Sequence, residues 1–361
     1  MVIRKLYQII IVVLFASLCI GCAKHDFYVM SAIDSNFSSA VSKEINIDNG
    51  NIEVYRIVND EIYGAVVNYD EHPILYGTND LIVYNLKNDR IKLYSLDLIG
   101  RIIDFYISDE YIYYIEVSDS NGFNWCLKKY SINDNSYNVL KCGVIQDIIN
   151  TPRILGVYGQ SLIVFMMDKS SLKIEYEFVK FDNEIETLIS GSGDVANRLG
   201  EFPYNTYNYY LSNGIIYYSL LDGEGNQKVM SYDIFDKDLE IIFENNSNNG
   251  FLNNYKMNGK YCYFQLITSY NSNSKSFIKT NGSLKSFSSS INTFDNFIAY
   301  NKLLFHNKGN VWKLLNLDTG KFQLLKLNID AYPKYYIISE NKILIKDKTG
   351  RYYIVEVALI K

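Results

Sequence analysis

A unit of about 40–50 residues recurs seven times along this chain, and it restricts the fold more than any other feature. Each unit has an apolar segment, a tight polar turn and a second apolar segment, as in RIVNDEIYGAVV at 56–67 and YYLSNGIIYYSLL at 209–221. One landmark position per unit gives spacings of 50, 50, 54, 46, 42 and 39 residues. The landmarks are Ile62, Ile112, Leu162, Ile216, Cys262, Leu304 and Ile343.

Most units also contain a second hairpin, in which apolar and polar residues alternate with the period of a β-strand. Examples are 81–96, 126–141, 228–243 and 311–327, and their turns are rich in Asn, Asp and Gly. A strand-based repeat of this length is typical of β-propeller blades. We therefore predict an all-β chain folded as a seven-bladed β-propeller, with six or eight blades as alternatives. A β-sandwich or two stacked β-domains would not explain the regular unit.

The last unit supplies three strands, near 334–339, 342–347 and 351–358. We expect the segment at 41–47 to add the fourth, so that an N-terminal strand closes the last blade and removes an exposed sheet edge. This predicts one propeller domain over residues 41–361.

The beginning of the chain has the pattern of a secretory signal, because Arg4 and Lys5 precede an uncharged, mostly apolar run that ends at Cys22. It resembles the signal peptide of a bacterial lipoprotein, which is cleaved before a cysteine whose thiol receives a diacylglycerol. The sequence departs from that pattern at Cys19, where leucine is usual.

This resemblance implies a signal peptide at 1–21 and a lipidated cysteine with a flexible tether at 22–40. The mature protein would then be held by lipid, such as diacylglycerol and palmitate, on the extracytoplasmic face of the cell membrane. An uncleaved membrane anchor is the alternative.

The charge balance gives no electrostatic reason to bind nucleic acid, since 35 Lys and Arg face 40 Asp and Glu. We expect no nucleic-acid partner. The 33 tyrosines suit half-exposed strands, because the ring packs while the hydroxyl stays solvated.

Three cysteines remain beyond the leader and its final cysteine: Cys126, Cys142 and Cys262. Cys126 and Cys142 flank a predicted hairpin that turns at 134–135, so they fall nearly opposite each other. A disulfide between them is one interpretation. The odd count favours reduced, partly buried thiols instead.

The Ile-Tyr-Tyr steps at 112–114 and 216–218, each after a Ser-Asp or Asn-Gly turn, resemble those of YWTD- and TolB-like β-propellers. They are especially similar to lipoprotein propellers of uncharacterised function from low-GC Gram-positive bacteria, over about 50–361. The full Tyr-Trp-Thr-Asp signature is absent, and only Trp125 and Trp312 are present where quinone-binding propellers have regular tryptophans. The resemblance implies a scaffold that binds proteins, peptides or glycans, and it transfers no catalytic residue.

Beyond the leader, the sequence contains no HExxH, GxSxG or CxxC motif and no phosphate loop. The histidines are His25, His72 and His306. His72 follows two carboxylates, a pattern that fits a metal or acid–base fragment but is more typical of a polar loop. We predict no catalytic residue, metal site or cofactor.

The binding site of a propeller commonly lies on the loops that join second to third strands and one blade to the next. The longest such loops are expected at 68–80, 118–124, 190–207 and 268–276. Tyr and Asn beside a few charges suit contacts to peptide or sugar. The candidate binding residues are Tyr69, Asp70, Glu71, Asn121, Arg198, Glu201, Tyr204, Tyr207 and Tyr270.

Two functions remain open. The first is a non-catalytic binding scaffold in the cell envelope for a protein, peptide or glycan. The alternative is an extracellular hydrolase or lyase that acts on glycan or peptide through a site assembled from propeller loops, for which paired carboxylates about 5–10 Å apart would be a sign. A structural spacer, a third interpretation, predicts no concave site.

Overall fold

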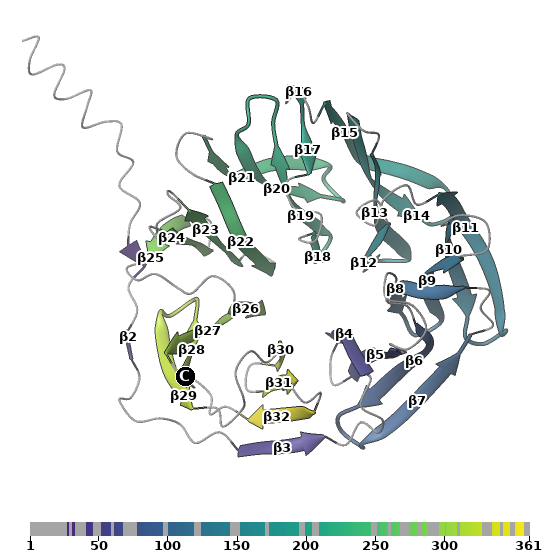
Figure 1. Ribbon diagram of the computed structural model, residues 1–361, viewed down its shortest axis with the longest axis horizontal. Coiled ribbons are helices and arrows are strands. Elements are labelled where there is room, and N and C mark those ends of the chain that lie inside the picture. The colour runs from purple at the N-terminus through teal and green to yellow at the C-terminus, as the bar shows by residue number, and fades with distance from the viewer. Residues whose placement is uncertain are drawn as a thin grey trace, which may run out of the picture.

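Small antiparallel sheets stand side by side around a ring, each with its first strand toward the centre (Figure 1). The structure is a computed structural model, and all its described elements are strands. It describes residues 27–28, 31–32, 41–45, 52–58, 61–67, 78–96, 100–118, 124–144, 152–169, 173–194, 199–203, 209–246, 251–258, 261–267, 274–280, 283–287, 296–299, 301–308, 311–326, 334–339, 342–346 and 351–356. No helix in these ranges is long and apolar enough to cross a membrane.

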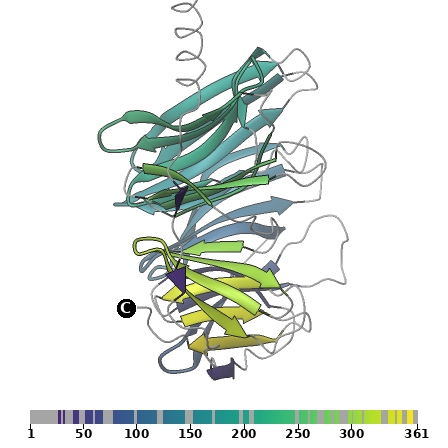
Figure 2. The same ribbon diagram turned by 90° about the vertical axis from the view of Figure 1, so that its left-hand side faces the viewer.

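The described strands group into seven four-stranded units, which confirms the all-β propeller prediction and agrees with its blade count. The first three units are β4 (Ile52–Val58), β5 (Glu61–Val67), β6 (Thr78–Asn85) and β7 (Arg90–Ser95); β8 (Arg101–Ile107), β9 (Tyr111–Ser118), β10 (Asn124–Ser131) and β11 (Ser136–Val144); and β12 (Arg153–Tyr158), β13 (Ser161–Lys169), β14 (Lys173–Phe181) and β15 (Ile185–Asp194). Neighbouring units pack face to face, as the side view shows (Figure 2).

The remaining units follow the same order. They are β18 (Tyr210–Ser212), β19 (Ile215–Leu221), β20 (Gln227–Asp233) and β21 (Asp238–Asn245); β22 (Phe251–Asn258), β23 (Tyr261–Ile267), β24 (Ser274–Thr280) and β25 (Ser283–Phe287); β26 (Asn296–Ala299), β27 (Lys302–Lys308), β28 (Val311–Asn316) and β29 (Lys321–Lys326); and β30 (Lys334–Ser339), β31 (Lys342–Lys346) and β32 (Tyr352–Glu356) with β3 (Val41–Ile45). Two short strands, β16 (Leu199–Gly200) and β17 (Phe202–Pro203), pair with β15 and β19.

The last blade is closed by the N-terminal strand, as predicted. β3 pairs antiparallel with β32, with Val41 opposite Glu356 and Ile45 opposite Tyr352 (Figure 1). The first and last parts of the chain therefore share one sheet, which joins them in the last blade.

Two short stretches upstream of β3 also pair with the propeller. β1 (Phe27–Tyr28) and β2 (Ser31–Ala32) run parallel to the outer strands β25 and β29. Cys22 and the rest of the leader lie outside the described residues. The signal peptide, the lipid and the flexibility of the tether therefore stay predictions.

The outer hairpin turns of the first, second, fourth and sixth blades share one backbone geometry, which fits their Asn, Asp and Gly content. The turn residue with positive φ is in each case the one just before the fourth strand: Asp89, Asn135, Lys237 and Gly320. The side chain before the turn often caps it, since Oδ1 of Asp233 accepts the backbone N–H of Phe235 at 2.8 Å.

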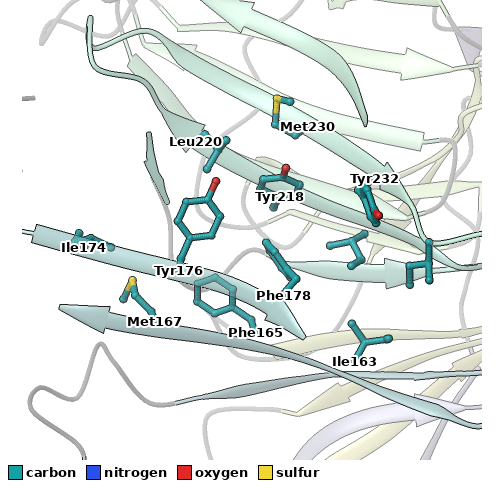
Figure 3. Packing of buried hydrophobic residues seen from close by; sticks show 12 residues of the cluster. Ile163, Phe165, Met167, Ile174, Tyr176, Phe178, Tyr218, Leu220, Met230 and Tyr232 are labelled. Atoms are coloured by element: carbon teal, nitrogen blue, oxygen red, sulfur yellow. The ribbon is translucent and has the colours of Figure 1, made fainter. Parts of the chain in front are cut away.

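The core lies between blades rather than inside any one of them. Between the third and fourth blades, Phe178 packs against Tyr218 with ring centroids 5.0 Å apart (Figure 3), and Phe165 stacks on Tyr209 at 4.0 Å. A similar cluster between the second and third blades contains Trp125 and Met166. Successive side chains of a strand point to opposite faces of the blade, so each blade packs against the blade on either side of it. This packing holds the blades at fixed positions.

Candidate functional site

A groove of about 760 Å³ lies where the second and third blades meet. The second blade contributes β10 and β11, and the third contributes β13, β14 and β15. The lining residues lie near the ends of β11, β13 and β15 and the starts of β10 and β14. These ends lead to the second-to-third strand connections and to the next blade, so the groove opens on the rim where binding loops were expected.

One wall of the groove is polar and is built by three adjacent strands of the third blade. Asp168, Glu175 and Ser192 are successive cross-strand partners on β13, β14 and β15. Glu177 and Ser190 form the next row. Cross-strand partners point to the same face of a sheet, so these carboxylates and hydroxyls line the groove together.

The opposite side of the groove has an aromatic floor that depends on a glycine. Trp125 on β10 lies directly across from Gly143 on β11. A Cβ atom at Gly143 would come within 2.7 Å of Trp125 Cζ2 and 2.8 Å of Nε1, so only glycine lets the indole lie flat against β11. Tyr176 and Gly191 repeat the arrangement in the third blade, where a Cβ would lie 2.6 Å from Tyr176 Oη.

Charged side chains make the groove acidic, because its lining contains three carboxylates and a single lysine. That lysine, Lys141, spans the two blades to Glu177, with Nζ 3.2 Å from Oε1. Thr187 Oγ1 donates to the other oxygen of Glu177 at 3.3 Å. Glu175 forms an ion pair with Lys173. Asp168 has no ion pair within the described part of the chain.

The groove lining also includes Tyr176, whose acidity depends on its surroundings. Burial raises its pKa, and the nearby Glu201 carboxylate raises it further. Its hydroxyl therefore stays protonated at neutral pH. Glu201 itself borders the groove wall, because its backbone N–H donates to the carbonyl oxygen of Ser192 at 3.2 Å. Its carboxylate lies 3.6 Å from Lys228 Nζ on the fourth blade.

Of the binding residues predicted from the sequence, Glu201 is described, and it is exposed beside the groove. The others lie outside the described residues: Tyr69, Asp70, Glu71, Asn121, Arg198, Tyr204, Tyr207 and Tyr270. Of the histidines, only the backbone of His306 is described, in β27. These positions stay predictions.

The groove residues themselves were not predicted from the sequence, although one signal was present. In β14, Glu175 and Glu177 alternate with Tyr176 and Phe178. An inner blade strand is covered on both faces, so an acidic face there marks a place where the next blade leaves a gap.

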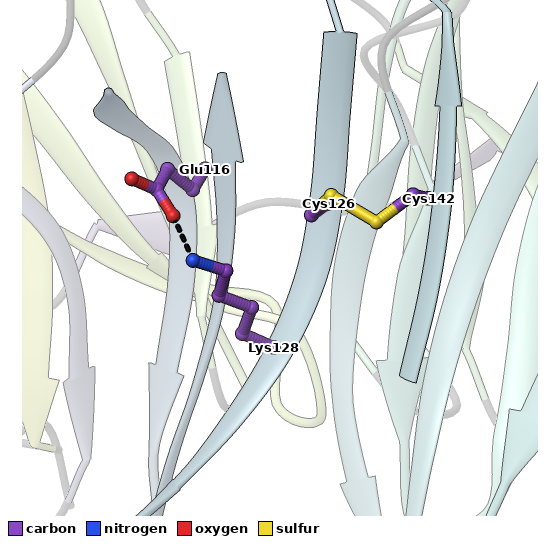
Figure 4. Close-up of a disulfide and its surroundings, with 4 residues drawn as sticks. All are labelled: Glu116, Cys126, Lys128 and Cys142. Carbon is purple, nitrogen blue, oxygen red and sulfur yellow. Dashed lines mark hydrogen bonds and ion pairs between the residues drawn. A yellow bond between two sulfur atoms is a disulfide. The ribbon is translucent and has the colours of Figure 1, made fainter. Parts of the chain in front are cut away.

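Cys126 and Cys142 form a disulfide at the edge of this site (Figure 4). They are direct cross-strand partners, with Cα atoms 4.1 Å apart, and Cys142 lines the groove. The structure thus differs from the reduced thiols that the odd cysteine count favoured, because the hairpin register brings these two together. No group of His, Cys, Asp and Glu suited to hold a metal ion occurs in the described ranges.

Comparison with known proteins identifies the fold. No family model and no curated protein sequence matches the chain. The β-propeller domain of the Trilobed protease from Pyrococcus furiosus is similar, with a TM-score of 0.54 and 11% identity over 84% of this chain and 94% of that one. An inactive virginiamycin B lyase from Staphylococcus aureus, solved with quinupristin, has a TM-score of 0.50 and 13% identity over 89% of this chain and 100% of that one.

A study of two prolyl endopeptidases supplies a third similar structure, with a TM-score of 0.53 and 10% identity over 86% of this chain and 51% of that chain. At these identities the likeness concerns the fold alone. The chain is a β-propeller, of a class whose known members include enzymes as well as domains of larger proteins.

Proposed function

We propose that this chain is a lipid-anchored β-propeller on the outer face of the cell membrane, where it binds a protein, peptide or glycan without catalysing a reaction. The observation that carries the proposal is the groove between the second and third blades. Its volume falls in the range of about 300–1,000 Å³ that is common for ligand sites, and its polar groups are fixed on strands.

The carboxylates of the groove favour binding over catalysis. A glycosidase needs one carboxylic acid that is protonated at work. Glu175 and Glu177 are instead both engaged by lysine ammonium groups. Both carboxylates can accept hydrogen bonds from a ligand.

The alternative, a hydrolase or lyase acting on glycan or peptide, rests on one observation. Asp168 and Glu175 are direct cross-strand partners, so two carboxylates face the groove side by side. Asp168→Asn would abolish turnover by such an enzyme. The spacer interpretation predicts no concave site, and the groove argues against it.

The disulfide supports the extracytoplasmic location, because disulfides persist in oxidising compartments and are rare in the cytosol. Replacing Cys22 by serine should move the protein from the membrane fraction to the soluble fraction. Cys19→Ser is the matched control and should remain with the membrane. Retention of the Cys22→Ser protein would contradict lipidation and favour an uncleaved anchor.

Binding is tested with the detergent-purified full-length protein on peptide and glycan arrays. Ser192→Tyr adds a ring to an exposed position of the groove wall and should remove most of the captured signal. Asn183→Tyr adds the same ring in the turn at the opposite end of the same hairpin and should change nothing. Equal capture by both variants would show that the groove is not the binding site.

A further inference from the structure

We infer that the groove takes a ligand carrying a positive charge, and specifically a peptide segment with an arginine or lysine side chain. This inference rests on the proposed binding function and names the class of ligand. It is carried by two adjacent carboxylates, of which Glu175 has an exposed lysine partner, in a groove that also contains an indole ring.

The first step is the charge of the third-blade wall. Asp168 and Glu175 lie directly opposite each other on β13 and β14, and like charges in that position destabilise a sheet. Lys173 pairs with Glu175, but both side chains are more than half exposed, so the pair is weak. Asp168 has no ion pair among the residues that the structure describes.

The second step is the position of the remaining lysine. Lys141 reaches across from the second blade, and its ammonium group is 3.2 Å from Glu177, one row below Asp168 and Glu175. Its charge is therefore already matched. A cationic group of a ligand would pair with Asp168 and Glu175, as Lys141 pairs with Glu177.

The third step is the aromatic floor. Trp125 lines the same groove, and the face of an indole attracts ammonium and guanidinium groups. The second blade uses this chemistry for its own lysines, since Lys129 Nζ lies 3.7 Å from the ring centroid of Tyr111 and Lys128 Nζ lies 4.7 Å from that of Tyr137. Carboxylates and an aromatic ring together discriminate a cation from a neutral sugar.

The volume of the groove indicates that the ligand is a peptide segment and not a free ion. A cavity of about 760 Å³ is in the range that buries a drug-sized ligand, well beyond one ammonium ion. A short peptide fills this space and places one basic side chain against the carboxylates.

The test uses a fluorescent octapeptide of Gly and Ser with one central arginine, and the same peptide with citrulline, which keeps the shape and loses the charge. Fluorescence anisotropy with the full-length protein should show about tenfold tighter binding of the arginine peptide at low salt. Raising the salt from about 0.05 to about 0.5 M should remove most of that difference, because exposed charges are then screened. Equal affinity of the two peptides, or no binding of either, would overturn the inference.

Two variants locate the effect. Asp168→Asn should weaken binding of the arginine peptide about fivefold or more and leave the citrulline peptide unchanged. Asp236→Asn removes an exposed carboxylate from a turn of the fourth blade and should have no effect. If Ser192→Tyr loses array capture but the arginine and citrulline peptides bind equally, the groove is a binding site without a preference for positive charge. The inference would then be overturned and the proposed binding function retained. Unchanged array capture in Ser192→Tyr would overturn both.

Discussion

Replacing Glu116 by glutamine should destabilise the propeller more than any surface charge substitution. Glu116 and Lys128 form an ion pair in the second blade, with side chains that are 4% and 7% exposed (Figure 4). Glu116 Oε1 also accepts the backbone N–H of Gly100 at 2.6 Å. Glutamine keeps the shape and this acceptor but leaves the Lys128 charge buried without its partner.

The size of the loss follows from the surroundings of Lys128. Breaking one side of a buried ion pair typically destabilises a protein by about 3–5 kcal/mol. The ring of Tyr137, with its centroid 4.7 Å from Nζ, offsets about 1 kcal/mol of this by a cation–π contact. We therefore expect Glu116→Gln to lower the free energy of unfolding by about 3 kcal/mol.

Urea unfolding followed by far-UV circular dichroism measures this change. Glu186→Gln, which removes a partly exposed partner of Lys180 and Lys237, is the control and should cost less than about 1 kcal/mol. The double variant Glu116→Gln with Lys128→Met leaves no buried charge and should recover most of the stability. The reasoning is refuted if the single variant loses less than 1 kcal/mol, or if the double variant is no more stable than the single one.

Three further changes test other contacts by the same measurement. Cys126→Ser with Cys142→Ser opens a bridge over 16 residues and should lower the unfolding free energy by about 3 kcal/mol; reductant should then affect only the wild type. Tyr209→Phe removes a buried hydroxyl that has no hydrogen-bond partner in the described structure, so it should raise stability by about 1 kcal/mol, and a loss would reveal a missed partner. Gly191→Ala places a Cβ 2.5 Å from a ring carbon of Tyr176 and should cost about 1–3 kcal/mol, whereas an unchanged midpoint would mean that the ring moves freely.

The fold was predictable because its information is local. A strand shows its period of two, and a turn shows its residue types, within a few positions of sequence. The hairpin expected to turn at 134–135 does so, with Asn135 at a φ of 51°. Closure by 41–47 followed from counting strands in the last unit, and β3 occupies Val41–Ile45.

The groove was not predictable because its information is not local. Lys141 and Glu177 are 36 residues apart and belong to different blades, and only radial packing brings them together. The disulfide is an intermediate case. The hairpin register placed Cys126 opposite Cys142, but the odd number of cysteines pointed the other way.

The strand register shows how the floor of this groove is built. The second, third and fourth blades have the same bulge between their third and fourth strands, at Leu127/Lys128, Phe178/Val179 and Val229/Met230. Counting two residues back from each bulge gives equivalent cross-strand pairs. They are Trp125 with Gly143, Tyr176 with Gly191, and Gln227 with Asn245.

In the second and third blades this position therefore holds an aromatic ring over a glycine, and in the fourth it holds two buried amides. A glycine on the outer strand removes a side chain from the groove wall, and the ring beneath it supplies an apolar floor. Gln227 and Asn245, 5% and 4% exposed, instead fill their own position. The second and third blades thus differ from the fourth at one repeated position, while the bulge beside it is the same in all three.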